Sequence, residues 1–172
     1  GKEILYFDLD RFQEGGKSVR GGIPVLFPIC GDLPDDVLSL PQGNFLMKQH
    51  GFARDLPWKI KSLEDQKGFS LTLFDNEMTR KSYPFLFSLD IQVRIYQNIL
   101  EIKTFVHNRG EEKMPFTFGL HPYFNFPDLQ NAYFEGLSDN CFNHIDMALT
   151  STKSQLEKLS EGVDFVSSTK GC

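Results

Sequence analysis

Six consecutive positions, from Gln49 to Arg54, contain an amide, an imidazole and a guanidinium. Glutamine can bind sugar hydroxyls, histidine can donate a hydrogen bond or transfer a proton, and arginine can hold an oxyanion through two parallel hydrogen bonds. These chemical properties make Gln49, His50 and Arg54 candidates for a substrate site. A polar loop in which Arg54 pairs with Asp55 or another carboxylate explains the same residues equally well.

Two further segments have a similar mixed character. Arg20 precedes the paired glycines Gly21 and Gly22, which let a backbone pass close to a ligand, although a solvated arginine before a turn is the simpler interpretation. His121 follows an apolar, strand-like run, and Pro122 ends that run directly after it. This arrangement would present an imidazole at the end of a sheet. A core histidine bonded to a backbone carbonyl is the plainer alternative.

Several other kinds of site lack the residues that they require. The remaining histidines, His107 and His144, have no HxH or HExxH spacing, and the three cysteines, Cys30, Cys141 and Cys172, form no CxxC pair. We therefore expect no metal site. The sequence has no GxGxxG, P-loop or GxSxG motif, so nucleotide binding and serine-hydrolase chemistry are not supported.

The composition is that of a folded, mildly acidic chain. Its 172 residues are 40% hydrophobic and 24% charged, with a formal net charge of -5. The negative charge argues against nucleic acid and against anionic membrane surfaces as partners. No apolar run approaches the roughly 18 residues of a membrane helix. The odd number and wide spacing of the cysteines favour a reducing compartment, so we expect a cytoplasmic protein.

Strand patterns dominate the middle of the chain. Apolar and polar residues alternate with a period of two in several runs, and turn-like residues separate these runs at 75–77 and at 97–98. Joined by short turns, they predict an antiparallel meander. The runs expected to form strands are Trp58–Glu64, Phe69–Phe74, Phe85–Tyr96, Ile99–His107 and Met114–Leu120.

The flanking regions have a different pattern. Glycine and proline punctuate the first third, which favours ordered loops between short strands and argues against helices there. Only the stretch Ser151–Leu159 is expected to be helical. The length and the lack of a linker predict a single domain over residues 1–172. We expect an all-β domain, an antiparallel β-sandwich, which the 17 phenylalanines suit.

Taken in order, the three polar segments resemble motifs of the aldose 1-epimerase (galactose mutarotase-like) superfamily. More narrowly, they resemble those of its glucose-6-phosphate 1-epimerase (hexose-6-phosphate mutarotase) branch. Each segment alone is a weak signal, whereas three in this order with strands between them are specific, and the resemblance extends from about Gly1 to Asp164. The matching runs are Arg20-Gly21-Gly22-Ile23-Pro24 with Phe27-Pro28 and Gly31, Gln49-His50-Gly51-Phe52-Ala53-Arg54 followed by Pro57-Trp58, and Leu120-His121-Pro122-Tyr123-Phe124.

The resemblance implies an antiparallel β-supersandwich with a sugar site in its concave face, incomplete at both ends in this chain. It implies that His121 is the general acid. Asp164 resembles the family's sugar-binding aspartate, although Phe165-Val166 follow it here instead of a basic and an aromatic residue. By the same matching of positions, the other substrate-binding residues would be Arg20, Gln49, His50 and Arg54, with the two arginines near a phosphate.

The activity implied is the interconversion of the α and β anomers of a hexose 6-phosphate, a small-molecule partner, without a cofactor. A base removes the proton of the C1 hydroxyl while an acid protonates the ring oxygen, and the two exchange roles on closure. The family's catalytic glutamate follows its aspartate, whereas no glutamate follows Asp164 in this chain. We therefore expect the chain to be part of a longer enzyme with its base beyond Cys172, and to be inactive if it is complete.

The sequence also fits two other functions. A non-catalytic carbohydrate-binding domain on the same scaffold would account for the absent glutamate. A mutarotase for free hexoses would share the scaffold, although the Arg20-Gly21-Gly22 run argues against it by analogy. The residues do not distinguish glucose, galactose and mannose phosphates, and they do not indicate an oligomeric state.

Overall fold

The computed structural model describes residues 3–14 and 19–170. The chain forms two compact units. The larger unit is Phe7–Tyr123, and the smaller one joins the segment up to Tyr6 with the segment from Phe124 onward. Within the described residues, no helix is both long and apolar enough to cross a membrane.

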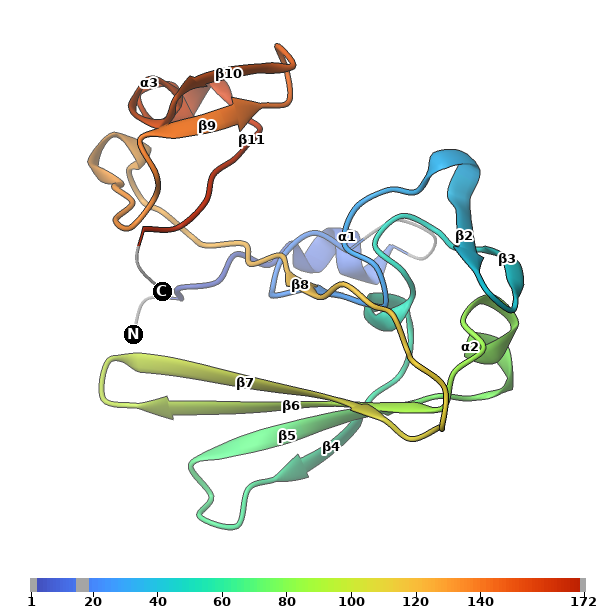
Figure 1. Ribbon diagram of the computed structural model, residues 1–172. Coiled ribbons are helices and arrows are strands. Elements are labelled where there is room, and N and C mark those ends of the chain that lie inside the picture. The colour runs from blue at the N-terminus through green and yellow to red at the C-terminus, as the bar shows by residue number, and fades with distance from the viewer. Residues whose placement is uncertain (1–2, 15–18, 171–172) are drawn as a thin grey trace. The chain divides into compact units, whose positions relative to one another are not determined.

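A four-stranded antiparallel sheet forms one layer of the larger unit (Figure 1). The strand order follows the sequence, as the alternating pattern predicts, and β6 pairs with β7 from Phe87↔Asn108 to Tyr96↔Ile99. The expected meander is therefore confirmed for four of its five runs, and the fifth, Met114–Leu120, does not join this sheet. Its strands are β4 (Lys59–Ser62), β5 (Gly68–Phe74), β6 (Phe87–Tyr96) and β7 (Ile99–Asn108).

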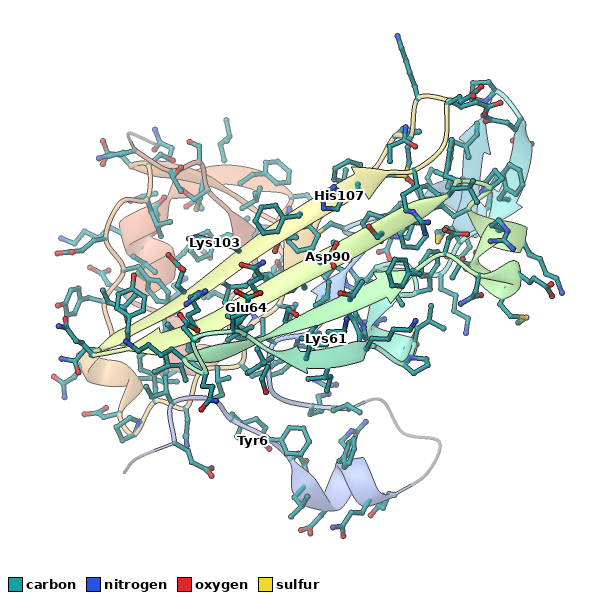
Figure 2. The ribbon with its side chains drawn as sticks, turned by 90° about the horizontal axis from the view of Figure 1, so that it is seen from below. Tyr6, Lys61, Glu64, Asp90, Lys103 and His107 are labelled. Carbon is teal, nitrogen blue, oxygen red and sulfur yellow. The ribbon has the colours of Figure 1, made fainter. Side chains whose placement is uncertain are left out.

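The two faces of this sheet differ because side chains alternate along a strand. One face buries Leu73, Leu89 and Ile91 in the core. The opposite, outer face carries polar side chains, among them Asp90 and His107, whose Oδ2 and Nε2 atoms lie 3.5 Å apart. Figure 2 shows this outer face, with Lys61, Asp90, Lys103 and His107 projecting from it.

Aromatic rings fill the core of the larger unit. The Phe27 ring has its centroid 5.2 Å from that of Phe87 and 6.0 Å from that of Tyr83, both in edge-to-face geometry. All three side chains are fully buried, and the Tyr83 hydroxyl donates to the Pro115 carbonyl at 2.9 Å. Because burial disfavours the phenolate, the pKa of Tyr83 is raised. In the sequence, Phe27 lies between Arg20–Pro24 and Gln49–Arg54, so this core also packs against the backbone that carries the candidate motifs.

Short strands and loops connect the first third of the chain, as expected. They are β1 (Val25–Leu26) and the hairpin of β2 (Val37–Leu40) with β3 (Gly43–Leu46). The expectation of no helix there is wrong. α1 (Leu9–Gln13) is capped by Asp8, which accepts a hydrogen bond from the Arg11 amide at 2.9 Å, and the 3-10 helices η1 (Pro34–Asp36) and η2 (Ala53–Asp55) follow. These elements are too short to show an apolar period.

Two other local expectations need correction. The turn expected at 75–77 instead begins the helix α2 (Glu77–Ser82), because Asn76 accepts from the amides of Met78 and Thr79 and the Thr79 hydroxyl accepts from Asn76 in return. Of the strand expected at Met114–Leu120, only β8 (Gly119–Leu120) forms.

The rest of Met114–Leu120 makes irregular contacts instead of a strand ladder. Pro115 has no amide hydrogen to give to a ladder, and its carbonyl accepts from Tyr83. The Thr117 amide donates to the carbonyl of Pro28. The segment is therefore held by the core that it covers.

The smaller unit holds a three-stranded sheet in the order β10-β9-β11. The helix expected at Ser151–Leu159 is confirmed with tighter bounds as α3 (Thr152–Leu156). The buried Asn143 side chain donates to Asp146 at 2.9 Å and to Gln155 at 3.3 Å, which ties the sheet to α3. The other elements are β9 (Asn140–Asn143), β10 (Ala148–Ser151), β11 (Phe165–Val166), η3 (Leu129–Asn131) and η4 (Leu159–Glu161).

Candidate functional site

The segment from Gly21 to Gly31 links the three polar motifs within the larger unit. On one side it pairs with the histidine motif: β1 lies antiparallel to β8, with Val25 opposite Leu120. The ladder continues beyond the strands, because the His121 amide donates to the Pro24 carbonyl at 3.0 Å and the Tyr123 amide donates to the Gly22 carbonyl at 2.9 Å.

The same segment contacts the glutamine–arginine motif on its other side. Phe27 forms a parallel bridge with Gly51, and its carbonyl accepts from the amides of Phe52 at 3.0 Å and Ala53 at 3.2 Å. The His50 amide donates to the Gly31 carbonyl at 2.9 Å. Three segments that are far apart in the sequence therefore lie side by side, and one continuous set of backbone hydrogen bonds holds them.

Gly51 permits the closest of these approaches. Its φ of +71° lies in the left-handed region, and a Cβ built on it would lie 2.2 Å from the Phe27 carbonyl oxygen and 2.7 Å from Pro28 Cδ. No side chain fits at that distance. The glycine of this motif is therefore required by the backbone contact and does not by itself indicate a ligand.

His50 occupies a tight turn and contacts the Gly21–Gly31 segment through its ring. The Gly51 amide closes the turn on the Lys48 carbonyl at 2.9 Å, and His50 has a φ of 64°. The Gly31 amide donates to His50 Nδ1 at 3.0 Å. The pKa of His50 is lowered, first by burial and then by the positive charge of Arg54, with a smaller contribution from His121, while Asp32 opposes the shift.

This lowered pKa predicts a pH dependence of stability. Between the folded pKa of His50 and its unfolded value of about 6.5, the unfolded chain binds more protons than the folded chain. The contribution of neutral His50 to the free energy of unfolding is therefore fully present above about pH 6.5, and it is lost as the pH falls from there through the folded pKa. We expect urea unfolding at a series of pH values to show this loss, and His50→Asn to flatten it. A variant curve parallel to the wild-type curve would contradict the assignment.

Asp32 also belongs to this neighbourhood, although it lies outside the three motifs. Its carboxylate acts on the charge of His50 and partly offsets the effect of Arg54. The signal was present in the sequence, since Asp32 directly follows Gly31. Only the structure shows that this position lies next to His50.

Arg54, Gln49 and Arg20 are exposed, as a substrate-binding role requires. Arg54 Nη2 donates to the Gln49 carbonyl at 3.3 Å, and within the described part of the chain Arg54 forms no ion pair with a carboxylate. The alternative interpretation, in which Asp55 or another carboxylate neutralises the guanidinium of Arg54, is therefore not supported. The Arg20 carbonyl accepts from the Asp8 amide at 2.9 Å, which holds its backbone at the start of the linking segment.

His121 is also exposed, so the alternative of a buried core histidine is wrong. Among the described residues, its backbone amide donates to a carbonyl, whereas its ring does not. The ring lies against Tyr123 with the centroids 5.0 Å apart. His121, His50 and Arg54 therefore share one electrostatic neighbourhood, and Asp32 adds a carboxylate to it.

Asp164 belongs to the smaller unit, where it pairs with His144. Asp164 Oδ1 lies 3.3 Å from His144 Nδ1, and the Asp164 carbonyl accepts from the His144 amide at 2.9 Å. Both side chains are exposed. The spacing of His144 and Asp164 in the sequence does not predict this pair, because the pairing of β9 with β11 brings the two residues together.

The loop that carries Gln49, His50 and Arg54 also lines a cavity of about 470 Å³. Gln49, His50 and Arg54 do not line it, so this apolar cavity is distinct from the candidate site. Among the described residues, no group of three or more histidine, cysteine, aspartate or glutamate side chains could hold a metal ion. The cavity lining comes from β3 and η1, the loop and α2: Asp36, Leu46, Met47, Lys48, Gly51, Phe52, Asp55, Leu56, Met78, Thr79 and Ser82.

The family model for aldose 1-epimerase matches residues 11–167, which include all three motifs. The chain belongs to the aldose 1-epimerase family. The resemblance inferred from the three motifs is therefore confirmed. The match also crosses both compact units of this family member.

Curated relatives of this aldose 1-epimerase family chain carry a narrower name. A protein named "Putative glucose-6-phosphate 1-epimerase" from Escherichia coli (strain K12) is 34% identical over 150 residues, which are 86% of this chain and 46% of the relative. A protein of the same name from Salmonella typhimurium is equally similar, with the same coverage. The chain spans about half the length of the curated relatives that it matches.

Solved structures support the fold of this family member. The Slr1438 protein from Synechocystis sp. PCC 6803 superposes with a TM-score of 0.80 at 37% identity, over 91% of this chain and 55% of that one. The structure of "a putative mutarotase (YeaD)" from Salmonella typhimurium superposes with a TM-score of 0.64 at 31% identity, over 86% of this chain and 47% of that one. The expected fold class, an all-β galactose mutarotase-like sandwich, is confirmed.

Proposed function

We propose that the protein containing this chain interconverts the α and β anomers of a hexose 6-phosphate by acid–base opening and closure of the sugar ring. The observation that carries this proposal is the convergence of the three motifs on the Gly21–Gly31 segment, which places His121, His50 and Arg54 in one neighbourhood. The names of the curated relatives support the same reaction.

The proposed chemistry requires one acid and one base. His121 gives a proton to the ring oxygen while a carboxylate accepts the proton of the C1 hydroxyl, so the C1–O5 bond breaks and an aldehyde forms. Rotation about the C1–C2 bond and closure on the other face of the carbonyl give the second anomer, and both protons return. The exposed ring of His121 is accessible to a substrate, as this role requires.

Binding of the substrate is assigned to the remaining motif residues. Gln49 and His50 contact sugar oxygens, and Arg20 and Arg54 contact the phosphate, since guanidinium groups hold phosphate through paired, charge-assisted hydrogen bonds. The freedom of Arg54 from an ion pair within the described residues supports its part in this assignment. Asp164 is proposed as a further sugar ligand on the basis of the family motif.

The wider setting of the protein is part of the same proposal. We infer that residues 1–172 belong to one mutarotase-like domain, which the family match across both units supports. We also infer a cytoplasmic location, because Cys30 and Cys141 are free thiols and suit a reducing compartment.

Replacing Arg54 with alanine tests the phosphate assignment. We expect KM for glucose 6-phosphate to rise about tenfold or more, because a charged hydrogen bond to phosphate is lost, while KM for free glucose changes little. Arg94→Ala is the matched control, since Arg94 pairs with Asp65 on the outer face of the sheet. Equal increases in KM for both sugars would count against a phosphate role for Arg54.

A further inference from the structure

His50 and Gly31 hold each other through two reciprocal hydrogen bonds. The His50 amide donates to the Gly31 carbonyl at 2.9 Å, and the Gly31 amide donates to His50 Nδ1 at 3.0 Å. His50 adopts a φ of 64°, in the left-handed region that is unfavourable for a residue with a side chain. A residue kept in this conformation by two specific bonds is positioned with little freedom of its ring.

The second of these bonds fixes the tautomer of the ring. A backbone amide can only donate, so His50 Nδ1 must present its lone pair to Gly31. The proton of the neutral imidazole is then on Nε2. The flipped ring would place a C–H group against the Gly31 amide and leave that amide without its acceptor, which is costly for a partly buried group.

The charges around His50 favour the neutral ring. Arg54 from η2 and His121 from the end of β8 both disfavour a positive charge on His50, and Asp32 from the loop after Gly31 is the one group among those acting on it that favours it. Burial of the ring is the largest cause of the lowered pKa of His50, and the effects of Arg54 and His121 add to it. Protonation would also break the bond from the Gly31 amide, because Nδ1 would become a donor.

We propose that the Gly31 amide keeps His50 as a neutral hydrogen-bond donor, which presents Nε2–H to a substrate oxygen and takes no part in proton transfer. The two imidazoles of the site thereby have different tasks: His50 binds through a fixed N–H group, and His121 exchanges the proton. The part that concerns substrate rests on the proposed function, whereas the tautomer and the charge of His50 follow from the contacts with Gly31 and its neighbours.

Long-range ¹H–¹⁵N NMR spectra of the histidine rings test the tautomer directly. The full-length protein would be labelled with ¹⁵N, and the His50 signals would be assigned by their loss in His50→Asn. We expect Nδ1 to have the shift of an unprotonated nitrogen and Nε2 that of an N–H nitrogen, and we expect both shifts to persist to a lower pH than in an ordinary imidazole, whose midpoint is about 6.5. A proton on Nδ1, or a ring that protonates with an ordinary midpoint, would overturn the proposal.

Kinetics of two variants test the task of the ring. His50→Asn retains a residue that tolerates positive φ and a side-chain oxygen that can accept from Gly31, but it lacks the Nε2–H group. We expect kcat/KM for glucose 6-phosphate to fall about tenfold, by the same factor at each pH. His50→Gly keeps the turn without any side chain, and we expect a loss at least as large.

The shape of the pH profile separates the possible outcomes. A loss of kcat/KM confined to one side of the pH profile would show that His50 titrates during the reaction. An unchanged kcat/KM in both variants would show that the Nε2–H group does not contribute to substrate binding. Either result overturns the proposal. If the wild-type protein has no epimerase activity, the proposed function fails, and the NMR spectra still decide whether His50 is a fixed neutral donor.

Discussion

Replacing His121 with asparagine is expected to lower kcat for anomer interconversion about a hundredfold or more. The asparagine amide has a similar size and can hydrogen-bond, but it cannot transfer a proton, and general acid catalysis typically contributes about 10²–10⁴ in rate. KM should change little, because the phosphate contacts assigned to the arginines are intact. Exchange spectroscopy at saturating glucose 6-phosphate measures kcat for this comparison.

The matched control for this variant is His107→Asn. His107 is an exposed histidine that lies 3.5 Å from Asp90 on the outer face of the sheet (Figure 2). His107→Asn makes the same substitution as His121→Asn but outside the candidate site. The kcat of His107→Asn should therefore equal that of the wild-type protein. Normal turnover in His121→Asn would remove His121 as the acid, and an equal loss in both variants would point to a general effect on the fold.

The second large effect is expected on stability, from Gly51→Ala. The added Cβ would lie 2.2 Å from the Phe27 carbonyl oxygen, so the loop that carries His50 and Arg54 must move away from the linking segment. We expect the free energy of unfolding to fall by about 3 kcal/mol or more, through lost hydrogen bonds and disturbed packing around Phe27. Urea denaturation of the variant and the wild-type protein measures this difference.

Gly22→Ala separates the clash from the backbone strain. Gly22 has a φ of +68°, close to that of Gly51, but no atom lies within 4 Å of the Cβ that would be added. Alanine there should cost only about 1 kcal/mol, the ordinary penalty of positive φ. Similar losses in the two variants would contradict the claim that close backbone contact, and not conformation alone, requires glycine at position 51.

The sheet was predictable because its signal is local. Along Phe87–Tyr96 and Ile99–Asn108 the side chains alternate, and one face must be buried, which fixes both the strands and their register. The polar motifs were likewise recognisable as short runs of residue types. The roles assigned to their residues stay predictions, although the backbone places Arg20, His50, Arg54 and His121 within one hydrogen-bonded set of segments.

The features that could not be predicted depend on contacts between distant residues or on very short elements. A capping box at Asn76 converts an apparent turn into α2, and six residues show no helical period. The bond from the Gly31 amide to His50 and the pair of His144 with Asp164 arise from chain segments that meet only in the fold. Hydrophobic patterning carries no information on such pairings.

Anomeric exchange of glucose 6-phosphate, followed by two-dimensional ¹H NMR with the full-length protein, tests the central claim most directly. Free galactose serves as the control sugar in the same buffer. We predict exchange cross-peaks between the α and β H1 signals of the phosphosugar that grow well above the spontaneous rate, with little acceleration for galactose. No acceleration with either sugar, even where line broadening shows that the sugar phosphate binds, would contradict the account and favour a non-catalytic carbohydrate-binding domain.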